Sequence, residues 1–177
     1  MSRIAPLALQ SLALQSLTVA CGLALAGPAF ADDKHDHAAH QAAQAPKINV
    51  PSNAKDAVAV VERFSSALAT GLLEAAGVEL DPNVLILESG GAERSAAEYL
   101  GGHAKGDAAF LKAAHIQLID RTAKRSGDLV WVASKSELHR TVDGKASTTL
   151  STETMIVQRV GTTWKIVHIH WSSRPKR

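Results

Sequence analysis

The last third of the chain is a succession of four long β-rich segments joined by very short turns. Asp143-Gly144 is the dipeptide typical of a two-residue hairpin, and Ser126-Gly127-Asp128 and Gly161-Thr162 supply the other turns. Sequential strands joined this tightly form an antiparallel meander, and strands of this length twist and curl. The predicted strands cover residues 115–125, 128–141, 145–159 and 163–173.

A helix is expected before these strands. Apolar residues recur there at helical spacing, so one face of the segment should be buried. The pattern predicts a helix over about 54–69, then a short turn over 72–76 and a short strand over 84–88. The expected buried face consists of Ala57, Val61, Phe64 and Leu68.

A second helix is expected after Ser95, because Ser95 and Glu98 have the spacing of a capping box. It should continue to about residue 113, although Gly101, Gly102 and Gly106 weaken it. Helices gathered before the strands indicate an α+β fold, with the helices across the concave side of a curled sheet and a cone-shaped pocket between them. The expected inward face consists of Leu100, His103, Asp107, Phe110 and Ala114.

The first 31 residues have the pattern of an export signal. Arg3 leads into a nearly charge-free segment rich in Leu and Ala, and Ala29-Phe30-Ala31 is an A-x-A cleavage site. We expect cleavage after Ala31 and a periplasmic or secreted protein that is no longer tied to the membrane. A membrane anchor and a lipoprotein signal at Cys21 are the alternatives.

Residues 32–53 have no apolar periodicity and are expected to be a disordered linker, followed by one domain over 54–177. The linker contains His35, His37 and His40 beside carboxylates, a pattern that binds Cu²⁺ or Zn²⁺ weakly. A solvated polar tether is the alternative. The net charge of +2 gives no support for a nucleic-acid partner, and the single Cys excludes an intramolecular disulfide and a Cys-rich zinc site.

The end of the chain resembles the nuclear transport factor 2-like superfamily. Glu153-Thr154 is followed in the last strand by Trp164-Lys165-Ile166-Val167-His168-Ile169-His170-Trp171-Ser172-Ser173. The SnoaL-like and association-domain branch is similar: the association domain of calcium/calmodulin-dependent kinase II closes with a Trp-x-x-Val-His-x-His-x-Ser pattern. The resemblance extends over about 54–173 and implies a cystatin-like fold and a homodimer. It does not assign an activity, because the superfamily contains both enzymes and binding modules.

Five candidate residues for the pocket come from the second expected helix, the short strand and the third long strand. His103 and Asp107 lie one helical turn apart, so an inward His103 would be a general base oriented by Asp107. A pair on the helix surface is the alternative. Glu88 and Glu153 are expected at the cavity mouth, and Tyr99, the only Tyr, is expected to contact a ligand. Superfamily members that isomerise ketosteroids carry an acidic base and a Tyr/Asp pair, a set without a complete counterpart here.

Two histidines lie in the last strand. Regular alternation places His168 and His170 on the same face as Trp164 and Ile166, where both can contact one ligand. Together with His103 they could also bind one Zn²⁺ or Cu²⁺. Contacts that only shape the sheet are the alternative. Apart from copper or zinc, no cofactor is expected.

These patterns leave two main classes of function open. The first is an exported binding protein whose cone-shaped pocket holds a small, partly apolar ligand. The alternative is an isomerase, cyclase or dehydratase that uses the His103–Asp107 pair, and a second alternative is a periplasmic copper- or zinc-binding protein. Both faces of the last strand carry apolar residues, so we expect helices on one face and a second subunit on the other, as a homodimer through the sheet.

Overall fold

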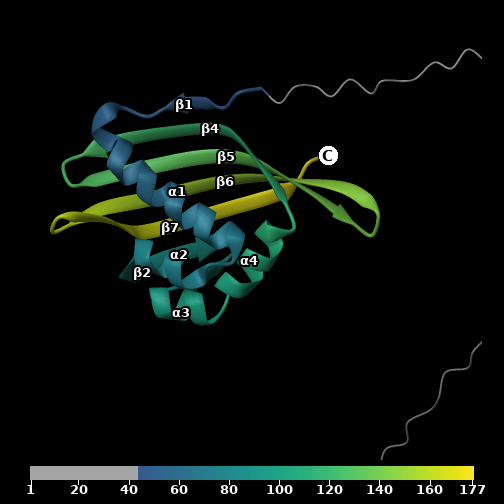
Figure 1. The fold of residues 1–177 in the computed structure, drawn as a ribbon, viewed down its shortest axis with the longest axis horizontal. Helices are drawn as coiled ribbons and strands as arrows, with labels where there is room; N and C mark the ends of the chain where they lie inside the picture. The colour runs from purple at the N-terminus through teal and green to yellow at the C-terminus, as the bar shows by residue number, and fades with distance from the viewer. Residues whose placement is uncertain (1–43) are drawn as a thin grey trace, which may run out of the picture. The chain divides into compact units, whose positions relative to one another are not determined.

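The computed structural model describes residues 44–177 (Figure 1). The predicted export signal and the three linker histidines lie outside the described residues. The expected linker over 32–53 is wrong at its C-terminal end, because β1 (Lys47–Asn49) pairs in parallel with β4 (His115–Ser126). The unpaired backbone groups of a sheet edge accept such an added strand.

The first predicted helix is present as α1 (Lys55–Thr70), after a single 3₁₀ turn at Ser52–Ala54. It ends at Gly71, whose φ of 80° is a left-handed conformation that glycine adopts without strain. The short turn expected next is the helix α2 (Leu73–Glu79). The predicted buried face of α1 is confirmed at Ala57, Val61, Phe64 and Leu68.

The remaining strands are β2 (Leu80–Glu88), β3 (Gly91–Glu93), β5 (Leu129–Val142), β6 (Lys145–Val160) and β7 (Thr163–Pro175). The sheet order is β1-β4-β5-β6-β7-β2-β3. Strands β4 to β7 are antiparallel neighbours, which confirms the predicted meander. β2 lies parallel to β7, and β3 turns back on β2. The hairpin between β5 and β6 has positive φ at Asp143 and Gly144, as a primed turn requires.

The prediction of one continuous second helix is wrong. The segment forms α3 (Ala96–Gly101) and α4 (Ala104–Lys112), with a break at Gly102 and His103. Adjacent glycines have low helix propensity, and the chain bends there. The capping box is altered as well: Ser95 Oγ accepts from the Glu98 N–H, but Glu98 Oε2 accepts from the N–H of Arg94.

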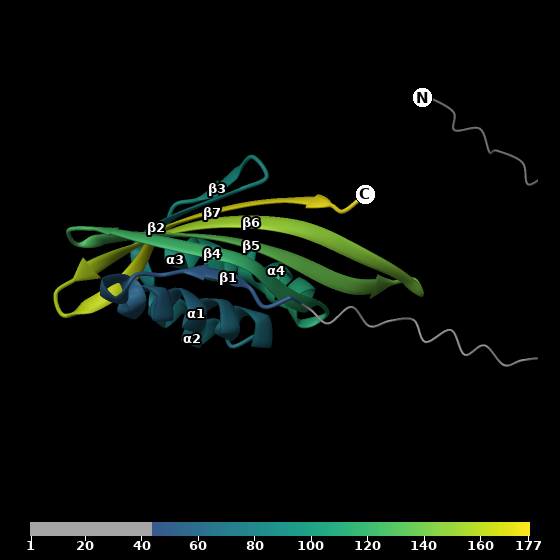
Figure 2. The same ribbon diagram turned by 90° about the horizontal axis from the view of Figure 1, so that it is seen from above.

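The helices lie on one side of the curled sheet, and Figure 2 shows α1 and α2 there. This arrangement confirms the expected α+β class and the packing of helices on the concave face. The apolar part of that face is wholly buried beneath α1. It includes Val130, Val132, Met155, Val157, Ile166 and Ile169. Within residues 44–177, no helix is both long and apolar enough to cross a membrane.

Candidate functional site

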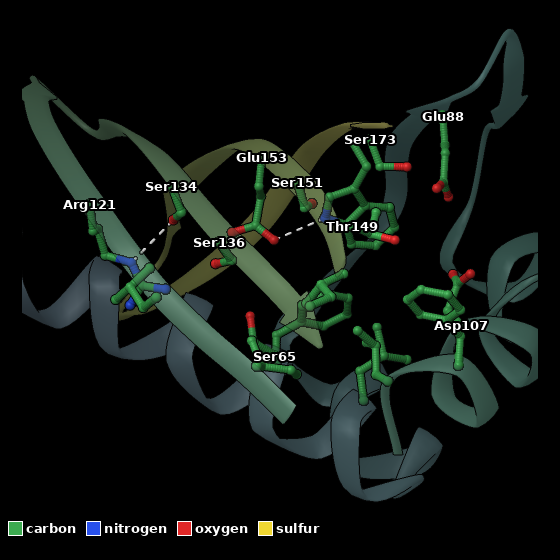
Figure 3. Close-up of a pocket in the computed structure, with 18 residues that line it drawn as sticks. Ser65, Glu88, Asp107, Arg121, Ser134, Ser136, Thr149, Ser151, Glu153 and Ser173 are labelled. Carbon is green, nitrogen blue, oxygen red and sulfur yellow. Dashed lines mark hydrogen bonds between the residues drawn. The ribbon is translucent and has the colours of Figure 1, made fainter. Parts of the chain in front are cut away.

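A cavity of about 220 Å³ lies between the concave face of the sheet and helices α1 and α4 (Figure 3). Its apolar wall comes mainly from the helices and from the outer ends of β4 and β5. This wall consists of Phe64, Leu68, Phe110, Leu111, Ile116, Leu118, Leu138 and Trp171. Its polar lining consists of Ser65, Glu88, Asp107, Arg121, Ser134, Ser136, Thr149, Ser151, Glu153 and Ser173.

Strand register arranges much of the polar lining in two rows across the sheet. The first row joins direct cross-strand neighbours on five strands: Arg121, Ser134, Glu153, Trp171 and Glu88. The neighbouring row consists of Leu118, Ser136, Ser151 and Ser173. Cross-strand neighbours on one face stand about 4.5–5.5 Å apart at Cβ, so each row is a continuous strip of side chains. A charged strip and a hydroxyl strip therefore lie side by side on the pocket floor.

Arg121 forms one end of the charged row. Its side chain is nearly buried, and its guanidinium donates to Ser134 Oγ at 3.2 Å and to Glu62 Oε1 at 2.9 Å. Glu62 projects from α1, so this contact ties the helix to the sheet at the edge of the cavity. The cation therefore already has an anionic and a hydroxyl partner.

Glu153 lies in the middle of the charged row. Trp171 Nε1 donates to its Oε2 at 2.9 Å. Burial raises the pKa of the Glu153 carboxyl, while the Trp171 bond and the Arg121 charge oppose that rise. The prediction that Glu153 faces the cavity is confirmed by its place in the lining, although it lies on the floor and not at the mouth.

Tyr99 and Asp107 form a hydrogen-bonded pair beside the cavity. The phenolic O–H of Tyr99, which is 1% exposed, donates to Asp107 Oδ2 at 2.9 Å. Burial, followed by the nearby Asp107 charge, raises the pKa of Tyr99 far above its ordinary value. Burial also raises the pKa of Asp107, and the Tyr99 bond opposes that rise. Asp107 lines the cavity, whereas Tyr99 lies behind it.

Glu88 lies across from Asp107. Figure 3 shows the two carboxyl groups pointing toward each other at one end of the cavity. Burial raises the pKa of Glu88, and the neighbouring Asp107 and Glu93 raise it further. The negative charge of Asp107 thus disfavours ionisation of Glu88.

The expected inward His103 is wrong. It sits at the break between α3 and α4, its side chain is 76% exposed, and its Nδ1 contacts Glu93 Oε1. Glu93 raises the pKa of His103 by a hydrogen bond and by its charge. Asp107 is instead bonded by Tyr99, so the structure does not contain the predicted His103–Asp107 pair.

The predicted facing of His168 and His170 is also wrong. Val167 is an extra residue opposite the Ile156–Val157 step of β6, and this bulge reverses the alternation of β7. Trp171 and Ser173 consequently line the cavity, and the two histidines do not. His168 Nδ1 contacts the Leu85 carbonyl oxygen at 2.9 Å, which confirms the alternative of a shape-setting contact.

The two histidines also fail to form the expected metal site with His103. In the described part of the chain, no three His, Cys, Asp or Glu side chains are placed to bind a metal ion. His170 is exposed, and His103 belongs to a different cluster with Glu93.

Sequence reasoning missed Arg121 and the hydroxyl residues. A signal for them was present: Ser134-x-Ser136 and Thr149-x-Ser151-x-Glu153 repeat with the period of a strand. Such a run replaces the apolar residues expected on a face that packs against a helix. Polar alternation on a predicted core face therefore indicates a lined cavity.

The comparisons with known proteins agree with this architecture. A model of the SnoaL-like domain matches residues 57–175. The chain belongs to the SnoaL-like domain family. This places it in the nuclear transport factor 2-like superfamily, as the terminal strand motif indicated. No curated protein is similar enough to this SnoaL-like chain to count as a match.

Solved structures include several relatives of this SnoaL-like protein. A Shewanella frigidimarina protein named as a candidate ketosteroid isomerase is 31% identical, with a TM-score of 0.66, over 71% of this chain and 100% of its own. The calcium/calmodulin-dependent kinase II hub of S. rosetta is 23% identical, with a TM-score of 0.56, over 68% of this chain and 95% of the hub. A candidate association domain of that kinase from Xanthomonas campestris is 21% identical, with a TM-score of 0.58, over 75% of this chain and 97% of its own. The last two likenesses show the fold alone.

Proposed function

We propose that the protein is exported and binds a small, partly apolar ligand in the cavity. One observation carries this proposal: a cavity of about 220 Å³ is bounded by apolar side chains on one side and by rows of hydroxyl and charged groups on the other. Binding sites for small molecules commonly combine an apolar wall with a few polar groups that fix orientation. The export signal predicted over residues 1–31 supports a periplasmic or extracellular place of action.

The arrangement of the lining indicates how such a ligand would lie. Phe64 and Leu68 from α1 face the sheet, and Ser151 and Ser173 are neighbours on the floor opposite. An apolar body would pack against the helix, and hydroxyl or carbonyl groups of the ligand would bond to the floor. A wholly apolar ligand would cover these hydroxyl groups and leave them without partners, which costs free energy.

A pocket-filling variant tests this proposal. Ser151 lies in the middle of the hydroxyl row, so Ser151→Leu should occupy the cavity and reduce the affinity for 2-naphthylmethanol at least tenfold. The probe has an apolar ring system and one hydroxyl group, and calorimetric titration measures its binding. Thr152→Leu makes a similar change on the opposite face of β6 and should leave the affinity unchanged.

Two results would contradict the proposal. One is the absence of saturable binding to the wild-type protein. The other is equal binding by wild type, Ser151→Leu and Thr152→Leu, which would place the probe elsewhere. A circular dichroism melting curve for each variant shows that a loss of binding does not come from unfolding.

An enzyme of the isomerase type is a second candidate, favoured by the facing carboxyl groups of Glu88 and Asp107. Acids whose pKa is raised toward neutrality are suited to donate and accept protons, and Tyr99 fixes the position of Asp107. In this version Asp107 replaces His103 as the base. The name of the Shewanella frigidimarina relative points in the same direction.

Isomerisation of a β,γ-unsaturated ketone, followed by ultraviolet absorbance, tests this second candidate. The expected result is turnover by the wild type and a loss of at least a hundredfold in Asp107→Asn. His103→Ala should retain activity, because that side chain is exposed. Turnover that depends on His103 and not on Asp107 would contradict the assignment.

We also propose a homodimer through the outer face of the sheet. This face carries a row of direct neighbours on β5, β6 and β7, namely Trp131, Ile156 and His168, with Leu85 on β2 beside them. Trp131 and Leu85 are more than one-third exposed.

Light scattering after gel filtration should show a dimer that Trp131→Glu dissociates. Val78→Glu, a matched change on the exposed surface of α2, should leave it intact, and a monomeric wild type would contradict the proposal.

A further inference from the structure

We propose that the cavity selects an organic amine, with the protonated amino group held by Glu88, Asp107 and Glu153 and the apolar body held by the helix wall. This inference rests on the proposed ligand-binding function and specifies the chemistry of the ligand. It concerns three carboxyl groups that all line one cavity but come from three separate elements: β2, α4 and β6.

The balance of charge in the lining is the first argument. The lining contains three carboxyl groups and one cationic side chain, Arg121. That guanidinium is already bonded to Glu62 and Ser134, at 2.9 and 3.2 Å. An anionic ligand would therefore meet three carboxyl groups and, within the lining, only a cation that already has partners, an arrangement that penalises a second buried negative charge.

The order of the side chains along the floor is the second argument. Trp171 stands between Glu153 on β6 and Glu88 on β2 as the direct neighbour of both. Trp171 Nε1 donates to Oε2 of Glu153, and the Glu88 carboxyl points toward Asp107. An ammonium group has three N–H donors, so it can bond to more than one of these carboxyl groups at once.

The aromatic part of the wall is the third argument. Phe64, Phe110 and Trp171 all line the cavity, and ring faces attract ammonium groups within about 6 Å. The Phe110 ring is already occupied, since the Arg140 guanidinium carbon lies 4.3 Å from its centroid, so the rings left to contact an ammonium group are those of Phe64 and Trp171. Carboxyl groups combined with aromatic rings thus favour an organic cation over an anion.

The protonation of the three acids agrees with this selectivity. Burial raises the pKa of Glu88, Asp107 and Glu153. The groups that face Glu88 are Asp107, Glu93 and His103; those that face Glu153 are Arg121, Ser134 and Trp171. A bound ammonium group would favour the ionised carboxylates, so amine binding should release protons from the protein.

A set of three probes that share one ring system tests the inference at neutral pH by calorimetric titration. The probes are 2-naphthylmethylamine, 2-naphthylmethanol and 2-naphthoate, which are cationic, neutral and anionic. The expected result is that the amine binds at least tenfold more tightly than the alcohol and that the carboxylate binds most weakly.

Two variants and one control locate the effect. Glu153→Gln and Glu88→Gln should each weaken amine binding at least fivefold and leave the affinity for the alcohol unchanged. Glu74→Gln removes a carboxylate from the exposed surface of α2 and should leave the affinities for the amine and for the alcohol unchanged. The titration of the amine in two buffers of different ionisation enthalpy should show proton release.

The failure of this inference differs from the failure of the proposed function. If the alcohol binds but the carboxylate binds as tightly as the amine, the amine inference is overturned and the ligand pocket stands. An amine preference that persists in both Gln variants would also overturn it, because the attraction would then come from elsewhere. If none of the three probes binds, the proposed function fails and the inference fails with it.

Discussion

The two halves of the concave sheet face are built from the same strands but have opposite characters. Toward one end, Val130, Val132, Met155 and Val157 are wholly buried beneath α1. Toward the other end, the same alternation on β5 and β6 presents small hydroxyl groups and Glu153 to a cavity. The pairing of β5 with β6 is continuous between the halves, so on these two strands the side chains and not the backbone create the difference.

The difference shows that side-chain volume decides where this fold is filled and where it is open. Protein interiors are close-packed, and a core closes only when side chains fill the space between the layers. Branched apolar residues fill it at the first end. Serines at the second end are too short to reach α1, so a lined space remains. The predictions below test this contrast, from the largest expected effect to the smallest.

Ile169→Ala should have the largest effect on stability. The Ile169 side chain is wholly buried in the apolar half, so its truncation removes contacts and leaves a void. The expected loss in the free energy of unfolding is about 2–5 kcal/mol, measured by urea denaturation. A loss below about 1 kcal/mol would show that this half is not closely packed.

Tyr99→Phe should have the next largest effect, because it leaves the partly buried Asp107 carboxyl without its phenolic donor. The expected loss in the free energy of unfolding is about 1–3 kcal/mol. The same change should raise the pKa of Asp107 further, which NMR titration of the side-chain carboxyl measures. Unchanged stability together with an unchanged Asp107 titration would be incompatible with the observed bond.

Glu153→Gln should change the dependence of stability on pH. Burial raises the pKa of Glu153 in the folded state, so ionisation of this carboxyl opposes folding. The stability that the protonated carboxyl contributes is therefore lost as the pH rises from the ordinary pKa of Glu through the raised pKa. The glutamine cannot ionise but keeps an acceptor for Trp171. At neutral pH, the free energy of unfolding of the variant should therefore equal or exceed that of the wild type. Any gain should be smaller than the loss caused by Tyr99→Phe. A steeper fall of its stability with pH would contradict this assignment.

Ser151→Ala should have the smallest effect. The side chain is small and borders a cavity, so its removal should change the free energy of unfolding by about 0.5 kcal/mol or less. Urea denaturation of Ser151→Ala and Ile169→Ala under the same conditions compares the loss in the free energy of unfolding between the two halves. Similar losses at both positions would remove the contrast.

The meander and α1 could be predicted because their signals are local. Asp143-Gly144 fixes a hairpin, and the spacing from Ala57 to Leu68 fixes a buried helix face. The bulge at Val167 could not, because β-branched and apolar residues occupy both faces of β7 and no turn residue marks the extra position. One undetected residue was enough to reverse the predicted facing of His168 and His170.

The candidate site was predicted only in part. Glu88, Asp107 and Glu153 do line the cavity, since each lies on an element whose inward face is apolar at neighbouring positions. His103 was misplaced because the Gly101-Gly102 pair ends α3, and the helical spacing used for the prediction does not extend across the break. The position of the Arg121 guanidinium depends on bonds to Glu62 on α1 and Ser134 on β5, and these long-range contacts leave no local signal in the sequence.

The most direct test of the ligand pocket is an NMR titration of methyl-labelled protein with 2-naphthylmethanol. We predict saturable shifts at methyl groups of the cavity wall, including Leu68, Ile116 and Leu138, and their disappearance in Ser151→Leu. The outer-face methyl groups of Leu85 and Ile156 should not shift. The absence of saturable shifts in the wall, or shifts confined to the outer face, would contradict the account.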